Sequence, residues 1–316
     1  MRVIVTGGAG FIGGETVLKL LDAGHSVLGI DRAMPSPTLL NSGAKWHTGD
    51  FANEVGLDCI TSFQPEAIVH CAGTSLVGPS VLDPEEYYNN NFIKTKAMLD
   101  YIVENKLTDI RIIFSSSAAT YGNPIMTPVQ EVDPTEPISP YGESKLMIDW
   151  MLKSYQRAYG LDFVSFRYFN ACGADSQARH GQLNGATHII ARVLESVKNK
   201  QDFTLYGTDY PTKDGTCIRD YIHVEDLALA HILAIDRTVP SDIYNLGTNT
   251  GYSNLEVIRA AAQITGINIP ILHGPKREGD PAVLTADAGK FMGVSGWQPK
   301  FGMTDIINHV WAWYNR

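Results

Sequence analysis

Cysteine is scarce in this sequence, with four residues in a chain of 316. Cys59, Cys71, Cys172 and Cys217 lie far apart, and no two of them form a C-x-x-C pair. A disulfide framework or a cysteine-rich zinc site therefore has little support. We expect free thiols and a reduced, cytoplasmic location.

Long apolar runs are absent as well. No stretch approaches the roughly 18 consecutive apolar residues that can span a bilayer. Met1 and Arg2 lead directly into Val3-Ile4-Val5, a strand pattern, without the basic, apolar and small-residue order of a secretion signal. We expect neither a membrane span nor a membrane partner.

Positive charge is in the minority, with 25 Lys plus Arg against 34 Asp plus Glu and a formal net charge of -9. Such a chain repels phosphate backbones, so we expect no nucleic-acid partner, although a few arginines placed together can still bind an anionic small molecule. The histidines include no H-E-x-x-H pair and no cluster with aspartate. We therefore expect no metal.

What the sequence does contain is an alternation of short β-branched runs with longer segments of helical periodicity. This pattern predicts an α/β fold with a Rossmann-type, doubly wound parallel sheet. A first helix is predicted over residues 11–23, and it ends at Gly24. The predicted strands are 3–6, 27–31, 67–71, 110–115 and 163–168.

The character of the chain changes at about Ala171, where loops rich in Gly, Asp, Asn and Thr begin. Ser253 and Glu256 form a capping-box pattern at the start of one helix. No linker is long enough to separate independent domains. We predict a first domain over residues 1–170 and a smaller C-terminal α/β domain over 171–316, with some segments returning to the first and a cleft between them. Helices are predicted here at 187–198, 225–236, 253–265 and 304–314.

Gly7, Gly10 and Gly13 form a G-x-x-G-x-x-G motif between the first predicted strand and helix. Glycines at these positions allow a tight turn, close approach of a pyrophosphate and close packing of helix on strand. Asp31 closes the second strand, where a carboxylate can hold a ribose diol and repel a 2′-phosphate. The motif favours NAD over NADP, although Arg32 weakens that preference. A turn that merely joins strand to helix is the alternative.

Tyr141 and Lys145 are four residues apart at the start of a predicted helix and so share one face. A tyrosine that acts as a base at neutral pH needs its pKa lowered from ~10 by roughly 3 units, about 4 kcal/mol. The Lys145 ammonium and a nicotinamide cation could supply that. Ser117 follows a strand end, where its hydroxyl could share the proton. Taken alone, this pattern also fits an exposed tyrosine beside a solvated lysine.

These motifs resemble the extended short-chain dehydrogenase/reductases, and longer stretches resemble the UDP-glucose (UDP-galactose) 4-epimerase family. The similar stretches span nearly the whole chain. They are VTGGAGFIG from Val5, FSSSAATYG from Phe114, SPYGESK from Ser139, RYFNACGA from Arg167, LYGTDYPTKDGTCIRDYIHVEDLA from Leu205, YNLG from Tyr244 and KREGDPA from Lys276.

The resemblance implies NAD-dependent C4 epimerisation of a UDP-hexose, either the glucose/galactose pair or the N-acetyl forms, through a transient 4-keto sugar. Tyr141 would be the base, Ser117 its hydrogen-bonding assistant, and Lys145 a ribose ligand and electrostatic partner. The resembling enzymes commonly form homodimers through helices of the first domain.

The resemblance also implies two sets of binding residues. For NAD these are Gly7, Gly10, Phe11, Ile12, Gly13, Asp31, Asp50, Phe51, Cys71, Ala72, Gly73, Asn91, Tyr141, Lys145 and Tyr168. For the UDP-sugar they are Ser117, Tyr141, Asn170, Tyr206, Arg219, Arg277, Asp280 and Leu284. Two arginines suit a pyrophosphate because each planar fork can donate paired hydrogen bonds, while ordinary surface ion pairs are the alternative.

The sequence departs from the family pattern at several positions. Ser75 replaces a lysine that often lies near the cofactor, and Lys94 stands where a glycine is common. Leu284 occupies a gate position that often holds tyrosine, and its smaller side chain would leave room for an N-acetyl group. The other departures are Ala119 in place of a threonine, and Gly185 and Ala186 in a loop that usually touches the diphosphate.

Two other functions remain open at this point. A sugar-nucleotide 4,6-dehydratase or decarboxylase needs an acidic side chain beside the catalytic serine, whereas Ser117 is followed by Ala-Ala-Thr. A non-catalytic dinucleotide-binding regulator would keep the fold alone. The presence of Ser117, Tyr141 and Lys145 argues against the regulator, while Ser75 and Ala119 keep it open.

Overall fold

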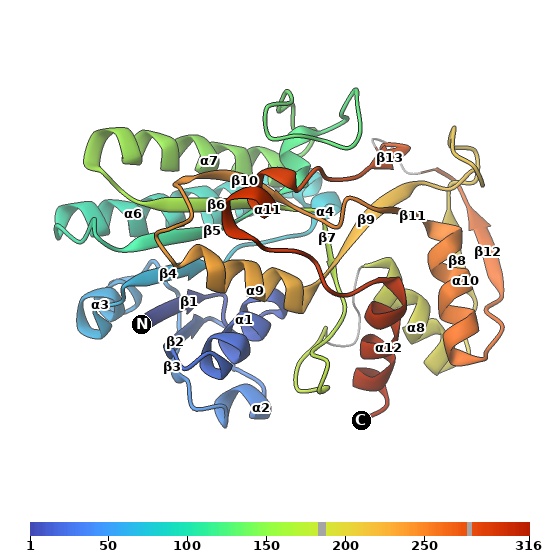
Figure 1. Ribbon diagram of the computed structural model, residues 1–316, viewed down its shortest axis with the longest axis horizontal. Coiled ribbons are helices and arrows are strands. Elements are labelled where there is room, and N and C mark those ends of the chain that lie inside the picture. Colours follow the sequence, from blue (N-terminus) through green and yellow to red (C-terminus); the bar gives the residue numbers. More distant parts are fainter. Residues whose placement is uncertain (183–187, 277–279) are drawn as a thin grey trace.

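The computed structural model describes residues 1–182, 188–276 and 280–316. Its centre is a seven-stranded sheet in which every neighbouring pair is parallel (Figure 1). The predicted Rossmann-type α/β fold is confirmed. The strand order is β10 (Asp242–Leu246), β6 (Phe163–Tyr168), β5 (Arg111–Ser117), β4 (Ala67–His70), β1 (Arg2–Thr6), β2 (Ser26–Asp31) and β3 (Lys45–Thr48).

Helices cover both faces of this sheet because successive strand residues point to opposite sides. Val3 and Val5 of β1 belong to the apolar core beneath one layer of helices, and Ile4 belongs to the core beneath the other. The first layer contains α1 (Phe11–Asp22), α2 (Pro37–Leu40), α9 (Val224–Ala234) and α11 (Gly289–Ser295). The second contains α3 (Glu54–Phe63), α6 (Lys94–Glu104) and α7 (Pro140–Tyr159).

Short helical segments lie near the carboxyl ends of β4 and β5. After β4 come α4 (Val77–Leu82), α5 (Pro84–Tyr87) and the π-helix η1 (Tyr88–Ile93), which runs straight into α6. After β5 comes a 3₁₀ turn, η2 (Ala118–Tyr121). The strand order changes direction between β1 and β4, and doubly wound sheets bind their ligands beyond the strand ends at such a switch point.

A second apolar core lies in the C-terminal half of the chain. Ser253 and Glu256 form the predicted capping box at the start of α10. The chain crosses between the two cores more than once, because β10 is a strand of the large sheet and α9 and α11 pack on that sheet. The elements around the second core are α8 (Ile189–Asn199), α10 (Asn254–Thr265), α12 (Met303–Tyr314), the pair β8 (Phe203–Tyr206) and β12 (Ile271–Gly274), and a small sheet of β7 (Asn170–Cys172), β9 (Ile218–His223), β11 (Gly251–Ser253) and β13 (Val283–Leu284).

Within the described ranges, every helix is too short or too polar to cross a bilayer.

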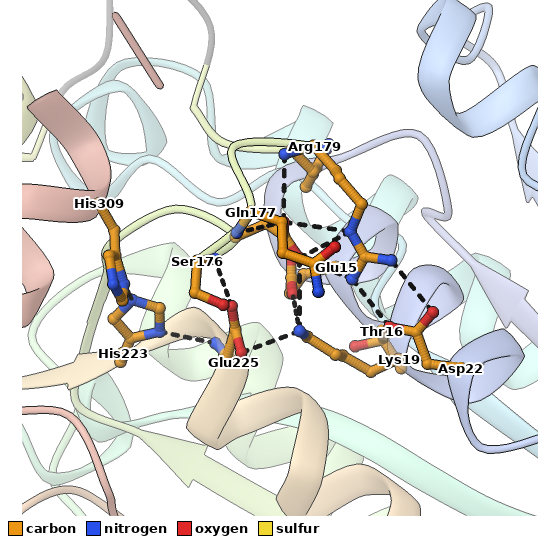
Figure 2. Close-up of polar contacts among 12 residues, drawn as sticks. Glu15, Thr16, Lys19, Asp22, Ser176, Gln177, Arg179, His223, Glu225 and His309 are labelled. Atoms are coloured by element: carbon orange, nitrogen blue, oxygen red, sulfur yellow. Dashed lines mark hydrogen bonds and ion pairs between the residues drawn. The ribbon is translucent and has the colours of Figure 1, made fainter. Parts of the chain in front are cut away.

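A network of charges ties α1 to the loop after β7 and to α9 (Figure 2). The Lys19 ammonium of α1 lies 2.8 Å from a carboxylate oxygen of Glu225 and 3.3 Å from one of Asp175. Arg179 joins Asp175 to Asp22, with a nitrogen 2.8 Å from an oxygen of each. The first helix and the C-terminal half are therefore held together by ion pairs as well as by apolar packing.

Glu15 lies inside this network without a hydrogen-bond partner for either carboxylate oxygen. Its side chain is fully buried, and its nearest cation, the Lys19 ammonium, is 3.6 Å away. Burial and the nearby Asp175 charge raise the pKa of Glu15 to about 9. Oxygens of Glu15, Asp175 and Glu225 lie within 4.8 Å of one another, as in a cation site, but the positive charge among them is that of Lys19.

Replacement of Glu15 by Gln is expected to raise the free energy of unfolding, increasingly so from about pH 5 to about pH 9. The folded chain keeps the Glu15 proton up to about pH 9, whereas the unfolded chain loses it near the ordinary pKa of 4.5. In this window the unfolded state binds fewer protons, so stability falls with rising pH by up to ~1.4 kcal/mol per pH unit. Glu15→Gln removes this loss, which urea unfolding across the window measures.

Asp22→Asn is the matched control in the same network. Arg179 holds the pKa of Asp22 below its ordinary value by hydrogen bonding, so this variant should lose stability at neutral pH rather than gain it. A Glu15→Gln protein with the pH dependence of the parent would show that Glu15 is ionised in the folded chain.

Candidate active site

A cavity of about 1100 Å³ lies at the carboxyl edge of the large sheet. Its walls include the turn after β1, the ends of β2, β5 and β6, and residues of the C-terminal half such as Arg219 and Leu284. Small-molecule pockets usually measure roughly 300–1,000 Å³, so this one has room for more than one small ligand.

The glycine turn forms one end of the cavity, and its packing leaves no room for side chains. A Cβ atom on Gly7 would lie 2.7 Å from the backbone nitrogen of Ala72, and one on Gly13 would lie 2.1 Å from the carbonyl oxygen of Gly7. Gly7 also has a φ of +70°, which favours glycine. This cradle suits a ligand that approaches the backbone closely.

The N-terminus of α1 opens on the same cavity. Gly10 is its N-cap, no side chain caps its first amides, and its first turn contains no acidic residue. These amides and the positive end of the helix dipole suit a phosphate group. The residues present therefore fit the diphosphate of a dinucleotide.

Asp31 stands at the end of β2 and lines the cavity. One carboxylate oxygen accepts a hydrogen bond from the Ala9 amide at 3.0 Å, and the other accepts one from the Ala33 amide at 2.9 Å. These bonds fix the orientation of the carboxylate, and each oxygen keeps a further lone pair for a ribose hydroxyl.

The structure brings Ser117, Tyr141 and Lys145 together in the cavity wall. Ser117 ends β5, while Tyr141 and Lys145 lie one turn apart at the start of α7. Ser139 caps this helix by accepting a hydrogen bond from the Gly142 amide at 3.2 Å. The cap and Pro140 set the start of α7 and with it the position of Tyr141.

Lys145 is held firmly in this wall. Its side chain is buried, its ammonium donates to the Ser115 carbonyl oxygen at 2.7 Å, and it lies 5.9 Å from the centre of the Tyr141 ring. Burial lowers the pKa of Lys145 to about 8. Burial raises the pKa of Tyr141 above its ordinary value, which the hydrogen bond with Ser117 offsets only in part. The sequence led us to expect a lowered pKa for Tyr141. In the structure the protein's own groups leave this pKa raised instead, because burial outweighs the hydrogen bond with Ser117.

Most of the other expected site residues also line the cavity. These are Gly7, Gly10, Phe11, Ile12, Gly13, Asp50, Phe51, Cys71, Ala72, Gly73 and Tyr168 from the expected cofactor set, and Asn170, Arg219, Asp280 and Leu284 from the expected substrate set.

Arg219 lines the cavity, and two partners hold its guanidinium in place. Its guanidinium forms an ion pair with Asp280 and donates to its neighbouring carbonyl oxygen, that of Ile218, at 2.7 Å. Leu284 of β13 is the register partner of Arg219 on β9, so the two residues lie side by side. Asn170 donates to the Asp220 carbonyl oxygen at 2.9 Å.

Two of the expected residues that the structure describes, Asn91 and Tyr206, do not line this cavity. Asn91 is buried, and its side-chain amide hydrogen-bonds to the Thr74 backbone and to the Ser144 hydroxyl. It therefore supports the loop after β4 rather than facing the cavity. Tyr206 lies on β8 beside Gly274 and does not line the cavity. Arg277 lies outside the described residues, as do the departures at Gly185 and Ala186.

The structure adds lining residues that motif analysis did not identify. The ring nitrogen Nε2 of His180 donates a hydrogen bond to the Phe11 carbonyl oxygen at 3.0 Å, while Trp313 and Arg316 reach the cavity from the C-terminal end of the chain. Nothing local in the sequence marks these residues, because only the fold brings them to the glycine turn.

Comparison with known proteins shows which family the chain resembles over most of its length. The model of the "NAD dependent epimerase/dehydratase family" matches residues 3–247. A UDP-glucose 4-epimerase of Halalkalibacterium halodurans is 43% identical, with 99% of this chain and 96% of the relative covered.

Solved structures give the same picture. UDP-glucose 4-epimerase from Bifidobacterium longum, in complex with NAD+ and UDP, is 36% identical with a TM-score of 0.91, covering 100% of this chain and 98% of the other. The UDP-Glc/GlcNAc 4-epimerase of Campylobacter jejuni is 34% identical with a TM-score of 0.86, covering 99% of both chains.

Proposed function

The chain belongs to the NAD dependent epimerase/dehydratase family, and we propose that it inverts the C4 centre of a UDP-hexose, interconverting UDP-glucose and UDP-galactose. The resemblance in the sequence is confirmed, and with it an NAD-dependent isomerase. The observation that carries the reaction is the convergence of Ser117, Tyr141 and Lys145 in one cavity with the glycine turn.

The residues that would hold NAD are those of the glycine turn, Asp31 and Lys145. When bound, NAD supplies the reversible oxidation of C4 and a positively charged ring. The glycine turn and the uncapped start of α1 would hold the diphosphate, and Asp31 would hold a ribose diol.

Tyr141 and Ser117 handle the proton of the reaction. The Tyr141 phenolate accepts the proton of the sugar 4-hydroxyl as C4 is oxidised to the ketone, and the phenol returns it when C4 is reduced from the opposite face. Ser117 shares the proton through its hydrogen bond with Tyr141. The Lys145 ammonium favours the phenolate over the phenol. No outside oxidant is consumed over the whole cycle.

Inversion requires the ketosugar to present its other face, so the nucleotide has to be anchored while the sugar stays loose. Arg219 suits the anchor because its planar fork can bind the diphosphate with paired, charge-assisted hydrogen bonds. The turn after Ser117 contains Ala118 and Ala119 and no carboxylate, so it lacks the acid that a dehydratase or decarboxylase would need.

Tyr141→Phe is expected to lower the turnover of UDP-galactose to UDP-glucose by ~10²–10⁴-fold, the usual contribution of a general base. NAD binding should survive, because the ring and the glycine turn remain. The measurement is a coupled assay for UDP-glucose together with calorimetry of NAD binding. Ser117→Ala serves as the comparison and is expected to show a smaller loss of turnover. Turnover within about twofold of the parent would exclude Tyr141 as the base.

We extend the proposal to UDP-N-acetylhexosamines because Leu284 lines the cavity beside Arg219. The Campylobacter jejuni relative is named for both glucose and N-acetylglucosamine substrates. A leucine leaves space that a tyrosine ring would fill, so the N-acetyl group has room.

Leu284→Tyr is expected to lower kcat/KM for UDP-N-acetylgalactosamine at least tenfold while changing that for UDP-galactose much less. Leu284→Val is the matched control, since it keeps the site open and should retain both substrates. Comparison of both turnovers in the three proteins measures the effect. An equal loss of both substrates in Leu284→Tyr would mean that residue 284 does not select the sugar.

We propose that the chain forms a homodimer. The contact surface would be an apolar hollow of about 510 Å³ on the outer side of η1 and α7. Trp150 is its largest exposed side chain, at 57% exposure, and the hollow also contains Phe92, Leu146 and Met147. Exposed apolar area of this kind is typical of contact surfaces. A second copy of the chain is the proposed occupant, in line with the helix-mediated dimers of the resembling family. A cytoplasmic location is proposed from the free thiols.

Trp150→Glu is expected to shift the protein from dimer to monomer, because a charge would be buried in the apolar contact. Light scattering after gel filtration measures the mass. Leu272→Glu is the control, since Leu272 is similarly exposed, at 53%, but lies on β12 in the C-terminal half. A Trp150→Glu protein that remains dimeric at low micromolar concentration would place the contact elsewhere.

A further inference from the structure

Lys94 reaches the cavity from the first residue of α6, directly after the π-helix η1. Its ammonium nitrogen lies 2.6 Å from Oδ2 of Asp50 and 2.8 Å from Oδ1 of Asn90. All three side chains line the cavity.

Asp50 is held on both sides by this arrangement. Its Oδ1 accepts a hydrogen bond from the Ala52 amide at 3.0 Å, while its Oδ2 faces Lys94. Burial would raise the pKa of Asp50, but the hydrogen bond from Lys94 keeps it below its ordinary value. The carboxylate is therefore ionised and its ion pair with Lys94 is formed at neutral pH.

The Lys94 ammonium keeps bonding capacity toward the cavity. An ammonium has three N–H donors, and two are directed to Asp50 and Asn90. The side chains of Lys94 and Asp50 are partly exposed, at 28% and 23%. A third donor is thus available to a ligand in the cavity.

The position of this donor within the cavity follows from the strand ends. The Gly49 amide donates to the Asp31 carbonyl oxygen at 2.7 Å, and Asp50 follows Gly49 directly. The Lys94–Asp50 pair therefore belongs to the end of the cavity at which Asp31 stands. By the proposed function this end takes the adenosine half of NAD, while Arg219 and Leu284 mark the UDP-sugar end.

We propose that Lys94 is a cofactor-binding residue that donates its third N–H to the adenosine half of NAD. Adenosine offers acceptors in its ring nitrogens and ribose oxygens, and Asp50 beside the ammonium can accept from the adenine amino group. The pair thus presents a donor and an acceptor next to each other, which matches the edge of adenine. This inference rests on the proposed function.

The test is calorimetric titration of the full chain, stripped of nucleotide, with ADP and separately with UDP. Lys94→Met should weaken ADP binding about tenfold, about 1.4 kcal/mol, and leave UDP binding unchanged. Lys94→Arg, which keeps the charge and the donors, should recover most of the loss. Lys96→Met is the matched control, because Lys96 lies on the same helix in a surface ion pair with Asp100.

A double-mutant cycle with Asp50→Asn separates direct contact from an effect through Asp50. If Lys94 binds the ligand, Lys94→Met still weakens ADP binding in the Asp50→Asn background. If Lys94 only orients Asp50, the second substitution has no further effect and the proposal is overturned. Unchanged ADP affinity in Lys94→Met also overturns it. Failure of the parent chain itself to bind ADP or NAD would instead refute the proposed function.

Discussion

The close packing of the glycine turn is the constraint on which the rest of the structure depends. With a Cβ on Gly13 placed 2.1 Å from the Gly7 carbonyl oxygen, α1 can leave β1 at this angle only if both residues are glycine. The direction of α1 then brings Lys19 to Asp175 and Glu225 (Figure 2), which anchors the C-terminal half. The turn that we propose to bind the diphosphate thereby also sets how the opposite wall of the cavity faces it.

Burial dominates the electrostatics of the catalytic wall. It raises the pKa of Tyr141 and lowers that of Lys145, so it favours the neutral form of both side chains. The Ser115 carbonyl oxygen and the Asp149 carboxylate favour the charged form of Lys145, but burial outweighs them. Burial therefore opposes formation of the Tyr141 phenolate. A positively charged ligand in the cavity would favour the phenolate. By the proposed function, Tyr141 would then accept a proton more readily when the cofactor occupies the cavity.

Local patterns in the sequence were enough to predict the central strands, α1 and α10, because each depends on neighbours within one strand–turn–helix segment. They also identified Ser117, Tyr141 and Lys145, which the structure places together in the cavity wall. The edge strands β3 and β10 were not predicted. Lys45–Thr48 has little apolar alternation, and Asp242–Leu246 is marked as a strand only by its pairing with β6.

The missed parts of the site have the same cause. The side-chain amide of Asn91 could hydrogen-bond to a ligand or to a loop equally well. In the fold Thr74 lies next to it, so the amide bonds to the loop. The sequence identified Lys94 as unusual, yet its partner Asp50 is 44 residues away, and their contact exists only after β3 and η1 have packed on the same sheet. Likewise, Asp280 was expected among the substrate-binding residues, and in the structure it is the ion-pair partner of Arg219, 61 residues away.

The arrangement of β9 and β13 explains how one site can hold a nucleotide tightly and a sugar loosely. Leu284 and Arg219 are register partners on adjacent parallel strands, so an apolar, nonspecific surface lies next to a charged, oriented anchor. By the proposed function, hydrogen bonds to the guanidinium would fix the diphosphate in direction, whereas leucine would offer the sugar no directional bond that has to break when the ring turns over. The two demands of inversion, retention and rotation, would thus be met by neighbouring residues of opposite character.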